Sequence, residues 1–219
     1  MSFHFYLRLL LVALLSVPVI LLLIVGMDVP LAKLQHDYGA PLQPFFLSFM
    51  RLHDGLMSVF WPLVVWPALL LLFSVARWRR WPHSTIWLVA LLTLIASQGI
   101  VNMLKMYFHR PRPLTVLGEL VSDAGFWQAE GQLDSFPSNH AAVAAGLLLP
   151  WALRFPKARP WLLTWLGLVC LGRVVLEFHW LSDVVAGAAL GLLLTCAFEL
   201  ATWWLRPKLV AGSNNLLSS

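Results

Sequence analysis

The sequence predicts an all-α polytopic membrane protein with six transmembrane helices. Of its 219 residues, 60% are apolar and only 11% are charged, whereas a soluble domain carries roughly 25% charged residues. Six mostly apolar segments come close to the roughly 20 residues that a helix needs to cross a bilayer. The charged residues are concentrated between these segments.

The expected spans form one domain over residues 1–209, followed by a flexible Ser- and Asn-rich tail at 210–219. The first apolar segment is expected to remain as a span, because its apolar core is long and no Ala-x-Ala cleavage pattern follows it. The spans are Leu7–Val25, Leu56–Ala76, Ser84–Leu104, His140–Leu153, Trp161–Leu176 and Asp183–Leu205.

Basic residues predict the orientation of the bundle. Most of them share one side if six spans are right, and the positive-inside bias assigns that side to the cytoplasm. They are Arg8, Arg77, Arg79, Arg80, Arg154, Lys157, Arg159, Arg206 and Lys208. Both termini are then cytoplasmic, and the outward connections are Asp28–Gly55, Lys105–Asn139 and Gly172–Ser182.

Two other classes of function are not indicated by the composition. The net charge of +5 does not predict nucleic-acid binding, because the basic residues form short clusters between apolar runs. Cys170 and Cys196 both lie inside apolar runs, where a cysteine behaves as a small hydrophobic residue. Neither a metal site nor a disulfide framework is expected.

Three short motifs fall on the outward face. They are the segment Lys105–Pro113, the tetrapeptide Pro137–His140, and the pair Gly172–Arg173 followed by His179 and Asp183. The spans are defined by apolar segments alone, so the shared face of the motifs independently indicates a functional site.

Three motif cations predict a phosphate site. Lys105, Arg112 and Arg173 are costly at the end of an apolar bundle unless they pair or bind an anion. The guanidinium fork matches phosphate oxygens, and clustered cations suit the negative charge spread over a phosphoryl-transfer transition state. Arg110 is instead expected to extend its side chain to the membrane interface without a role in the site.

The second and third motifs supply groups for chemistry. Ser138 precedes an apolar run and is a good helix N-cap, and a helix N-terminus favours an anion. His140 would lie beside that anion and can protonate a leaving oxygen. If the stretch from His179 to Asp183 is helical, the two share one face. The carboxylate would then accept from one ring nitrogen, and the other nitrogen could attack phosphorus.

Taken in order, the pattern Lys-x6-Arg-Pro, Pro-Ser-x-His and Arg-x5-His-x3-Asp resembles the type 2 phosphatidate phosphatase superfamily, which also includes bacterial acid phosphatases and vanadium haloperoxidases. The resemblance covers Lys105 to Asp183. It implies a phosphohistidine on His179 oriented by Asp183, with His140 as acid and then as base. It implies no metal or other cofactor, and phosphate ligands from Lys105, Arg112, Ser138 and Arg173.

Two positions depart from the family pattern. Asn139 stands where the family often has glycine, and its backbone N–H is still expected to donate to the phosphate. Gly172 stands where the family often has serine, so a hydroxyl contact at that position is in doubt.

The expected substrate is an amphiphilic lipid phosphate or diphosphate in a bacterial-type inner membrane. Undecaprenyl diphosphate and phosphatidylglycerol phosphate are the leading candidates, and phosphatidate and a lipid A phosphate are further candidates. A lipid phosphotransferase with the same intermediate is the nearest alternative, and an anion transporter or channel is the alternative outside enzymes. Haloperoxidase chemistry is not expected in so apolar a chain.

The segment Leu114–Phe136 is either a lid over the head group or a plain surface loop, and the sequence favours neither. Among the remaining histidines, His53 with Asp54 weakly suggests a pair of metal ligands, and His109 is a candidate for the rim of the site.

Overall fold

The computed structural model describes residues 3–58, 64–118, 123–129 and 131–215. These residues form helices and loops without a β-strand, apart from an isolated bridge between Arg110 and Asp134. The predicted all-α class is therefore confirmed for the described part of the chain. The helices are α1 (Phe3–Leu22), the π turn η1 (Leu23–Met27), α2 (Asp28–Tyr38), the 3₁₀ turn η2 (Ala40–Leu42), α3 (Gln43–Ser58), α4 (Trp66–Trp78), α5 (Thr85–Phe108), α6 (Pro113–Leu117), α7 (Asn139–Arg154), α8 (Arg159–Val175) and α9 (Leu181–Asn215).

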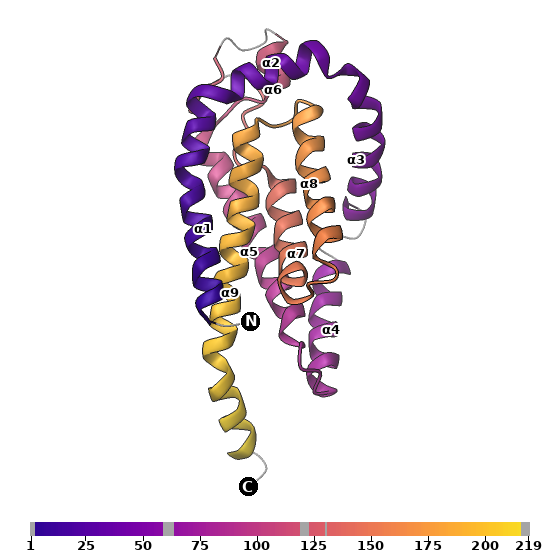
Figure 1. Ribbon diagram of the computed structural model, residues 1–219, viewed down its shortest axis with the longest axis vertical. Helices are drawn as coiled ribbons and strands as arrows, with labels where there is room; N and C mark the ends of the chain where they lie inside the picture. The colour runs from indigo at the N-terminus through magenta and orange to yellow at the C-terminus, as the bar shows by residue number, and fades with distance from the viewer. Residues whose placement is uncertain (1–2, 59–63, 119–122, 130, 216–219) are drawn as a thin grey trace.

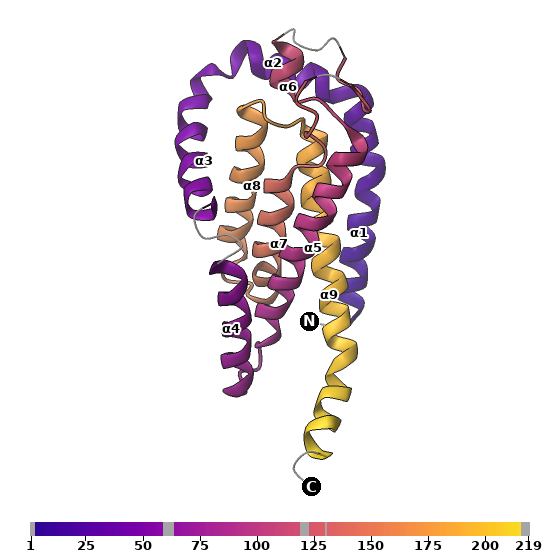
Figure 2. The ribbon, with the colours of Figure 1, turned by 180° about the vertical axis from the view of Figure 1, so that it is seen from behind.

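The first three helices form an arch over one end of the bundle. Helix α1 runs along α9, bends at the π turn and continues as α2, which crosses the end of the bundle (Figures 1 and 2). A π turn inside a helix is a common cause of such a bend. Helix α3 then descends beside α8. The connection expected at Asp28–Gly55 is therefore mostly helical.

Among the described residues, three helical stretches are long and apolar enough to cross a membrane, namely Phe3–Tyr38, Thr85–Phe108 and Leu181–Leu205. Trp66–Trp78 is a shorter apolar helix, and α7 and α8 have 16 and 17 residues. The second expected span, Leu56–Ala76, lies partly outside the described residues. The count of six crossings and the orientation remain predictions.

Helix α7 is the centre of the bundle and packs against α5, α8 and α9. Small residues allow the close approach of α9: a Cβ at Gly187 would lie 2.4 Å from the carbonyl oxygen of Ser138, and one at Gly191 would lie 2.5 Å from Cβ of Ala145. Small residues four apart are the usual device for close helix packing in membranes. The contact holds the start of α9 beside the start of α7.

Two polar clusters lie at opposite ends of this bundle. At one end Arg154 makes a bidentate pair with Glu199 at 2.8 and 2.7 Å and donates to the Thr85 hydroxyl at 2.9 Å.

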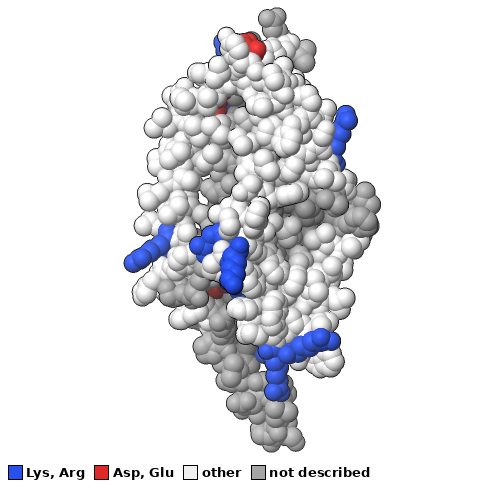
Figure 3. Space-filling model, turned by 45° about the vertical axis from the view of Figure 1, so that its right-hand side comes forward, with Lys and Arg blue, Asp and Glu red and all other residues white. Residues whose placement is uncertain are grey.

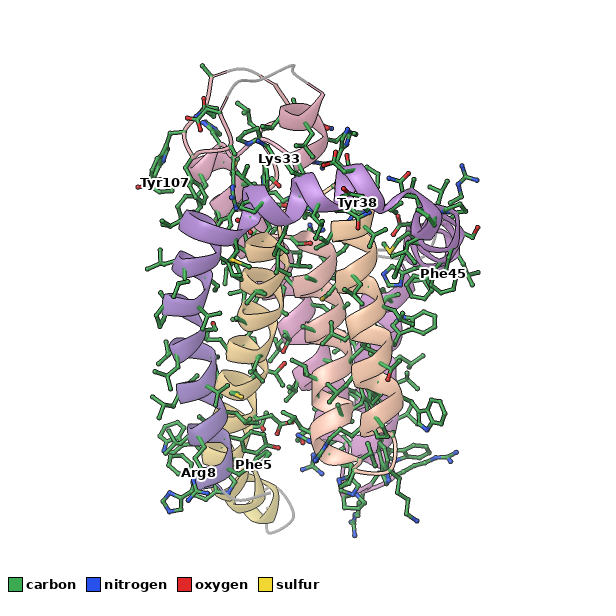
Figure 4. All side chains as sticks on the ribbon, turned by 45° about the horizontal axis from the view of Figure 1, so that its top comes forward. Phe5, Arg8, Lys33, Tyr38, Phe45 and Tyr107 are labelled. Atoms are coloured by element: carbon green, nitrogen blue, oxygen red, sulfur yellow. The ribbon has the colours of Figure 1, made fainter. Side chains whose placement is uncertain are left out.

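In Figure 3 most visible Lys and Arg side chains gather over the lower part of the molecule, which is the end with Arg154, below a broad uncharged surface. Figure 4 places Arg8 at that end and Lys33 at the other. The motif residues gather at the end with Lys33.

Helix α9 continues to Asn215, so helix extends into the segment that we expected to form the tail. The last residues, 216–219, lie outside the described part of the chain. A flexible tail therefore remains a prediction.

Candidate active site

His179 lies in the turn between α8 and α9. The backbone N–H groups of Phe178 and His179 donate to the carbonyl of Arg173 at 3.1 and 3.2 Å, which closes the end of α8. Helix α9 begins only at Leu181. The expectation that His179 and Asp183 share a helix face is therefore wrong. Asp183 instead accepts from the backbone N–H of Trp180 at 2.9 Å and caps the new helix.

The ring of His179 is held by a backbone carbonyl. Its Nδ1 lies 2.8 Å from the carbonyl oxygen of Ser135 and 3.7 Å from Oδ2 of Asp183. A carbonyl oxygen can only accept, so Nδ1 carries the proton and Nε2 has a free lone pair. The nearest partner of Nδ1 is therefore the Ser135 carbonyl and not the predicted Asp183 carboxylate, which lies farther from the ring.

His179 is neutral at ordinary pH. The side chain is 1% exposed, and burial lowers the pKa of His179 to about 4, although the nearby Asp183 carboxylate opposes the effect. Arg173 and Lys105 lower it further. Because the nucleophilic form of imidazole is the neutral one, the ring is ready to attack without first losing a proton.

Asp183 is fully buried, with polar partners on each of its oxygens. The Ser135 hydroxyl donates to Oδ2 at 2.5 Å, and Nη1 of Arg110 donates to Oδ1 at 2.7 Å. Ser135 is itself placed by a hydrogen bond from its backbone N–H to the carbonyl of Arg110 at 3.0 Å. One serine thus contacts Asp183 through its side chain and His179 through its backbone.

Arg110 does not extend to the interface, so that expectation is wrong. Its side chain is 2% exposed and joins two buried carboxylates, Asp183 through Nη1 and Asp28 through Nη2 at 2.8 Å. The guanidinium also lies 4.8 Å from the ring centroid of Phe126 and 5.2 Å from that of Trp180. A planar cation with several donors can satisfy both carboxylates at once, which a snorkelling side chain could not do.

Asp28 brings the start of α2 into the same network. Its carboxylate accepts from the backbone N–H of Ser182 at 3.0 Å and from the Ser182 hydroxyl at 2.5 Å, besides Arg110. Asp28 is 0% exposed. The arch formed by α1 and α2 is therefore tied to the first turn of α9 beneath the site.

Two of the predicted phosphate cations converge on one carboxylate. Arg112 donates to Asp134 through Nε at 2.8 Å and Nη2 at 2.7 Å, and Nζ of Lys105 lies 3.7 Å from the same group. Burial raises the pKa of Asp134, but the hydrogen bond from Arg112 and the charge of Lys105 outweigh it and leave the pKa lowered. Asp134 is therefore an anion that lies between the two cations.

The third cation, Arg173, is 6% exposed. Its Nε has no hydrogen-bond partner among the described residues, and its guanidinium lies 4.4 Å from the ring centroid of Phe178. Asp54, Arg112 and Asp134 are all within its electrostatic range. A buried guanidinium with an unused donor is suited to an anionic ligand.

The second motif begins a helix as predicted. Ser138 is the N-cap of α7 and accepts from the backbone N–H of Ala141 at 3.4 Å, and its own N–H donates to the carbonyl of Asp183 at 3.0 Å. The Asn139 amide donates to Gln98 at 3.4 Å. Nε2 of His140 lies 3.0 Å from Oδ1 of Asp54 on α3. The three motifs therefore meet at one end of the bundle.

An apolar cleft of about 410 Å³ opens next to this cluster. It lies between the start of α3 and the turn that follows α8. Phe178 belongs to both the cleft and the cluster, because it lines the cleft and faces the guanidinium groups of Arg112 and Arg173. The other apolar lining residues are Ala40, Pro44, Leu47, Leu114 and Leu176.

Several residues of the site were missed by sequence reasoning. Asp28 offered a signal, as a single acid at the end of a long apolar run. Arg110 lies within the first motif, but its local sequence predicts only an interfacial side chain. Ser135 and Asp134 offered no signal in one sequence, and Asp54 suggested only a metal ligand, because their contacts depend on how distant segments fold together.

Residues 86–207, more than half of the chain, match the PAP2 superfamily. This segment contains every motif of the site described above. The chain therefore belongs to the PAP2 superfamily, and the predicted family resemblance is confirmed.

Two curated relatives carry the description "Lipid A 1-phosphatase". The chain is 30% identical over 125 residues to one from Rhizobium johnstonii, which covers 55% of this chain and 50% of the relative. It is 30% identical over 130 residues to one from Rhizobium etli, covering 55% of this chain and 53% of the relative. The chain thus spans about half the length of these relatives. No solved structure matches significantly.

Proposed function

We propose that this protein is a membrane phosphatase that hydrolyses lipid phosphates or lipid diphosphates through a phosphohistidine on His179. The observation that carries the proposal is a buried imidazole whose Nδ1 is held by the Ser135 carbonyl, which leaves Nε2 free in the electrostatic range of Lys105 and Arg173. Membership of the PAP2 superfamily supports the same chemistry.

In the first half-reaction, Nε2 of His179 attacks phosphorus and the bond from phosphorus to the leaving oxygen breaks. Lys105, Arg112 and Arg173 neutralise the charge of the phosphoryl oxygens, and the Ser138 hydroxyl and the backbone N–H of Asn139 contribute at the positive end of the α7 dipole. His140 gives its proton to the leaving oxygen. The imidazolium that forms at His179 is stabilised by the buried carboxylate of Asp183.

In the second half-reaction, His140 takes a proton from water. The water oxygen attacks phosphorus, the bond to Nε2 breaks, and inorganic phosphate leaves. No step requires a metal ion, since three cations and a helix N-terminus supply the positive charge.

The lipid character of the substrate is supported by the cleft next to Phe178. A lipid chain there would leave its phosphate beside Arg112 and Arg173. Undecaprenyl diphosphate and phosphatidylglycerol phosphate remain the leading candidates from the sequence. The description of the two Rhizobium relatives adds weight to the 1-phosphate of lipid A.

The proposed setting is a bacterial-type inner membrane crossed six times, with both termini in the cytoplasm and the site at the outer face. The position of the motif residues at the bundle end opposite Arg8 and Arg154 supports this orientation.

Purified protein in detergent tests the proposal directly. We expect it to release inorganic phosphate from at least one of undecaprenyl diphosphate, phosphatidylglycerol phosphate, phosphatidate and lipid A phosphate, with and without EDTA. Labelled phosphate found in a second lipid would instead identify a phosphotransferase. Absence of turnover with the whole panel would favour the transporter, and a strict metal requirement would contradict the mechanism.

Asp134 is expected to compete with the phosphate for its cations. Changing Asp134→Asn removes the negative charge that holds Arg112 and Lys105, so orthovanadate, a mimic of the transition state, should inhibit at a concentration about threefold to tenfold lower. The measurement is the vanadate inhibition constant for phosphate release.

Asp123→Asn is the matched control for this change. Asp123 lies in the same segment, is exposed, and accepts only from the Gly125 N–H and the Gln128 amide among the described residues. Its loss should leave inhibition unchanged. Weaker vanadate binding by Asp134→Asn would mean that Asp134 organises the cations and does not compete with the ligand.

A further inference from the structure

Helix α3 brings a carboxylate to the second histidine of the site. Oδ1 of Asp54 lies 3.0 Å from Nε2 of His140, and the two side chains are 42% and 32% exposed. Asp54 lies outside the segment that matches the family, which begins at residue 86. The contact therefore depends on how helices α1 to α3 fold over the end of the bundle that carries the three motifs.

The position of α3 is set by its contact with α8. Phe46 and Met50 are buried and pack on Gly172, where a Cβ would meet Cγ and Sδ of Met50 and Cδ1 of Phe46 at 3.1 Å. Asp54 follows Met50 by four residues and lies on the same face of α3. The glycine that replaces the family's usual serine thus permits the close approach that carries Asp54 towards His140.

The neighbouring residue on α3 helps to hold this geometry. His53 is 4% exposed, and its ring centroid lies 6.4 Å from Phe49, 6.3 Å from Trp165 and 6.3 Å from His140. No group of three or more potential metal-ligating side chains occurs among the described residues. His53 and Asp54 suggested a pair of metal ligands in the sequence. In the structure His53 packs among aromatic rings and Asp54 contacts His140.

From this geometry we propose that Asp54 is the positioning residue of the general acid, holding His140 by accepting a hydrogen bond from its Nε2. This inference rests on the proposed function. With Nε2–H directed at Asp54, Nδ1 is the ring nitrogen that exchanges the proton. It makes no hydrogen bond to a described residue.

The proton balance follows from this assignment. Protonated His140 gives the Nδ1 proton to the leaving oxygen and becomes neutral with Nε2–H still on Asp54. Nδ1 then accepts a proton from the attacking water. The site thus has two imidazoles, each fixed through one nitrogen by an oxygen acceptor and reactive at the other: Ser135 fixes His179, and Asp54 fixes His140.

Two substrates with different leaving groups distinguish a residue that positions the general acid from a residue with only a structural role. An alkyl phosphate needs its leaving oxygen protonated, whereas p-nitrophenolate leaves without a proton. We expect Asp54→Asn to lower kcat/KM, which reports formation of the phosphohistidine and not its hydrolysis, about tenfold to a hundredfold for a long-chain alkyl phosphate. It should change kcat/KM for p-nitrophenyl phosphate less than threefold. Asp54→Glu should recover part of the loss, because it restores an acceptor.

Two further measurements complete the experiment. In a His140→Asn background, Asp54→Asn should cause no additional loss with the alkyl substrate, since the acid that it positions is absent. Asp37→Asn, an exposed carboxylate on α2, is the control and should leave both substrates unaffected. Asp54→Ser replaces the first variant if that variant does not accumulate in the membrane.

The possible outcomes are distinct. Equal losses on both phosphates, additive losses in the His140→Asn background, or wild-type rates would each overturn the role of Asp54 while leaving the phosphatase proposal intact. Failure of the wild-type protein to release phosphate from either compound would overturn the proposed function itself.

Discussion

His179→Ala is expected to lower phosphate release by at least about 10³-fold, the largest effect of any single change in this protein. In the proposed mechanism the imidazole forms the bond to phosphorus, and removal of a nucleophile leaves only the contribution of binding and electrostatics. The protein should still insert and purify, since the buried ion pairs of Arg110 remain. The measurements are the rate of phosphate release and the yield of acid-labile phosphoprotein from labelled substrate.

His109→Asn is the matched control. His109 belongs to the first motif and is exposed, with φ of 43°, a backbone conformation that asparagine tolerates. Its replacement should change the rate less than about twofold, as expected for a residue without a reacting group. If His179→Ala retained activity within tenfold of the wild type, the assignment of the nucleophile would be refuted.

Arg110→Gln is expected to impair both stability and activity. The change leaves Asp28 and Asp183 buried without their common cation, and loss of one partner of a buried ion pair typically costs about 3–5 kcal/mol. Because Asp183 also contacts Ser135, which holds His179, we expect phosphate release to fall by at least about a hundredfold, as when the orientation of a triad is lost. Thermal unfolding in detergent and the rate of phosphate release are the measurements.

Two variants show whether the effect comes from the buried pairs. Arg110→Lys keeps the charge but not the planar fork, so it should recover stability only in part. Arg51→Gln on α3 removes an exposed arginine and should leave the unfolding temperature unchanged. Wild-type stability and rate in Arg110→Gln would show that the two carboxylates do not depend on this cation.

Much of the site could be predicted from local signals. The spacing of Lys105 and Arg112 and the position of Arg173 predicted cations at one membrane face, and all three do gather at one end of the bundle. The prediction that Ser138 begins a helix is confirmed, because an N-cap depends on the residues directly around it. The all-α class followed from composition, since a bilayer requires backbone groups to be satisfied within each segment.

Predictions from the sequence were wrong where a contact depends on segments that are distant in the chain. The four-residue spacing of His179 and Asp183 suggested one helix face, but the chain turns between them and Ser135 supplies the partner of Nδ1. Arg110 resembled an interfacial residue, because nothing near it in the sequence shows that Asp28 will fold against it.

The sequence by itself therefore determined that the chain suits a bilayer, that it is helical, and which groups we propose to bind and transfer a phosphate. These properties follow from side-chain chemistry and short-range spacing. The tertiary structure decided which nitrogen of each imidazole is held and which carboxylate lies between the phosphate cations. It also decided that Asp28 and Asp54, far from the motifs in sequence, belong to the site. Those choices depend on the packing of α2, α3 and α9 around α7, and only the folded arrangement of these helices determines them.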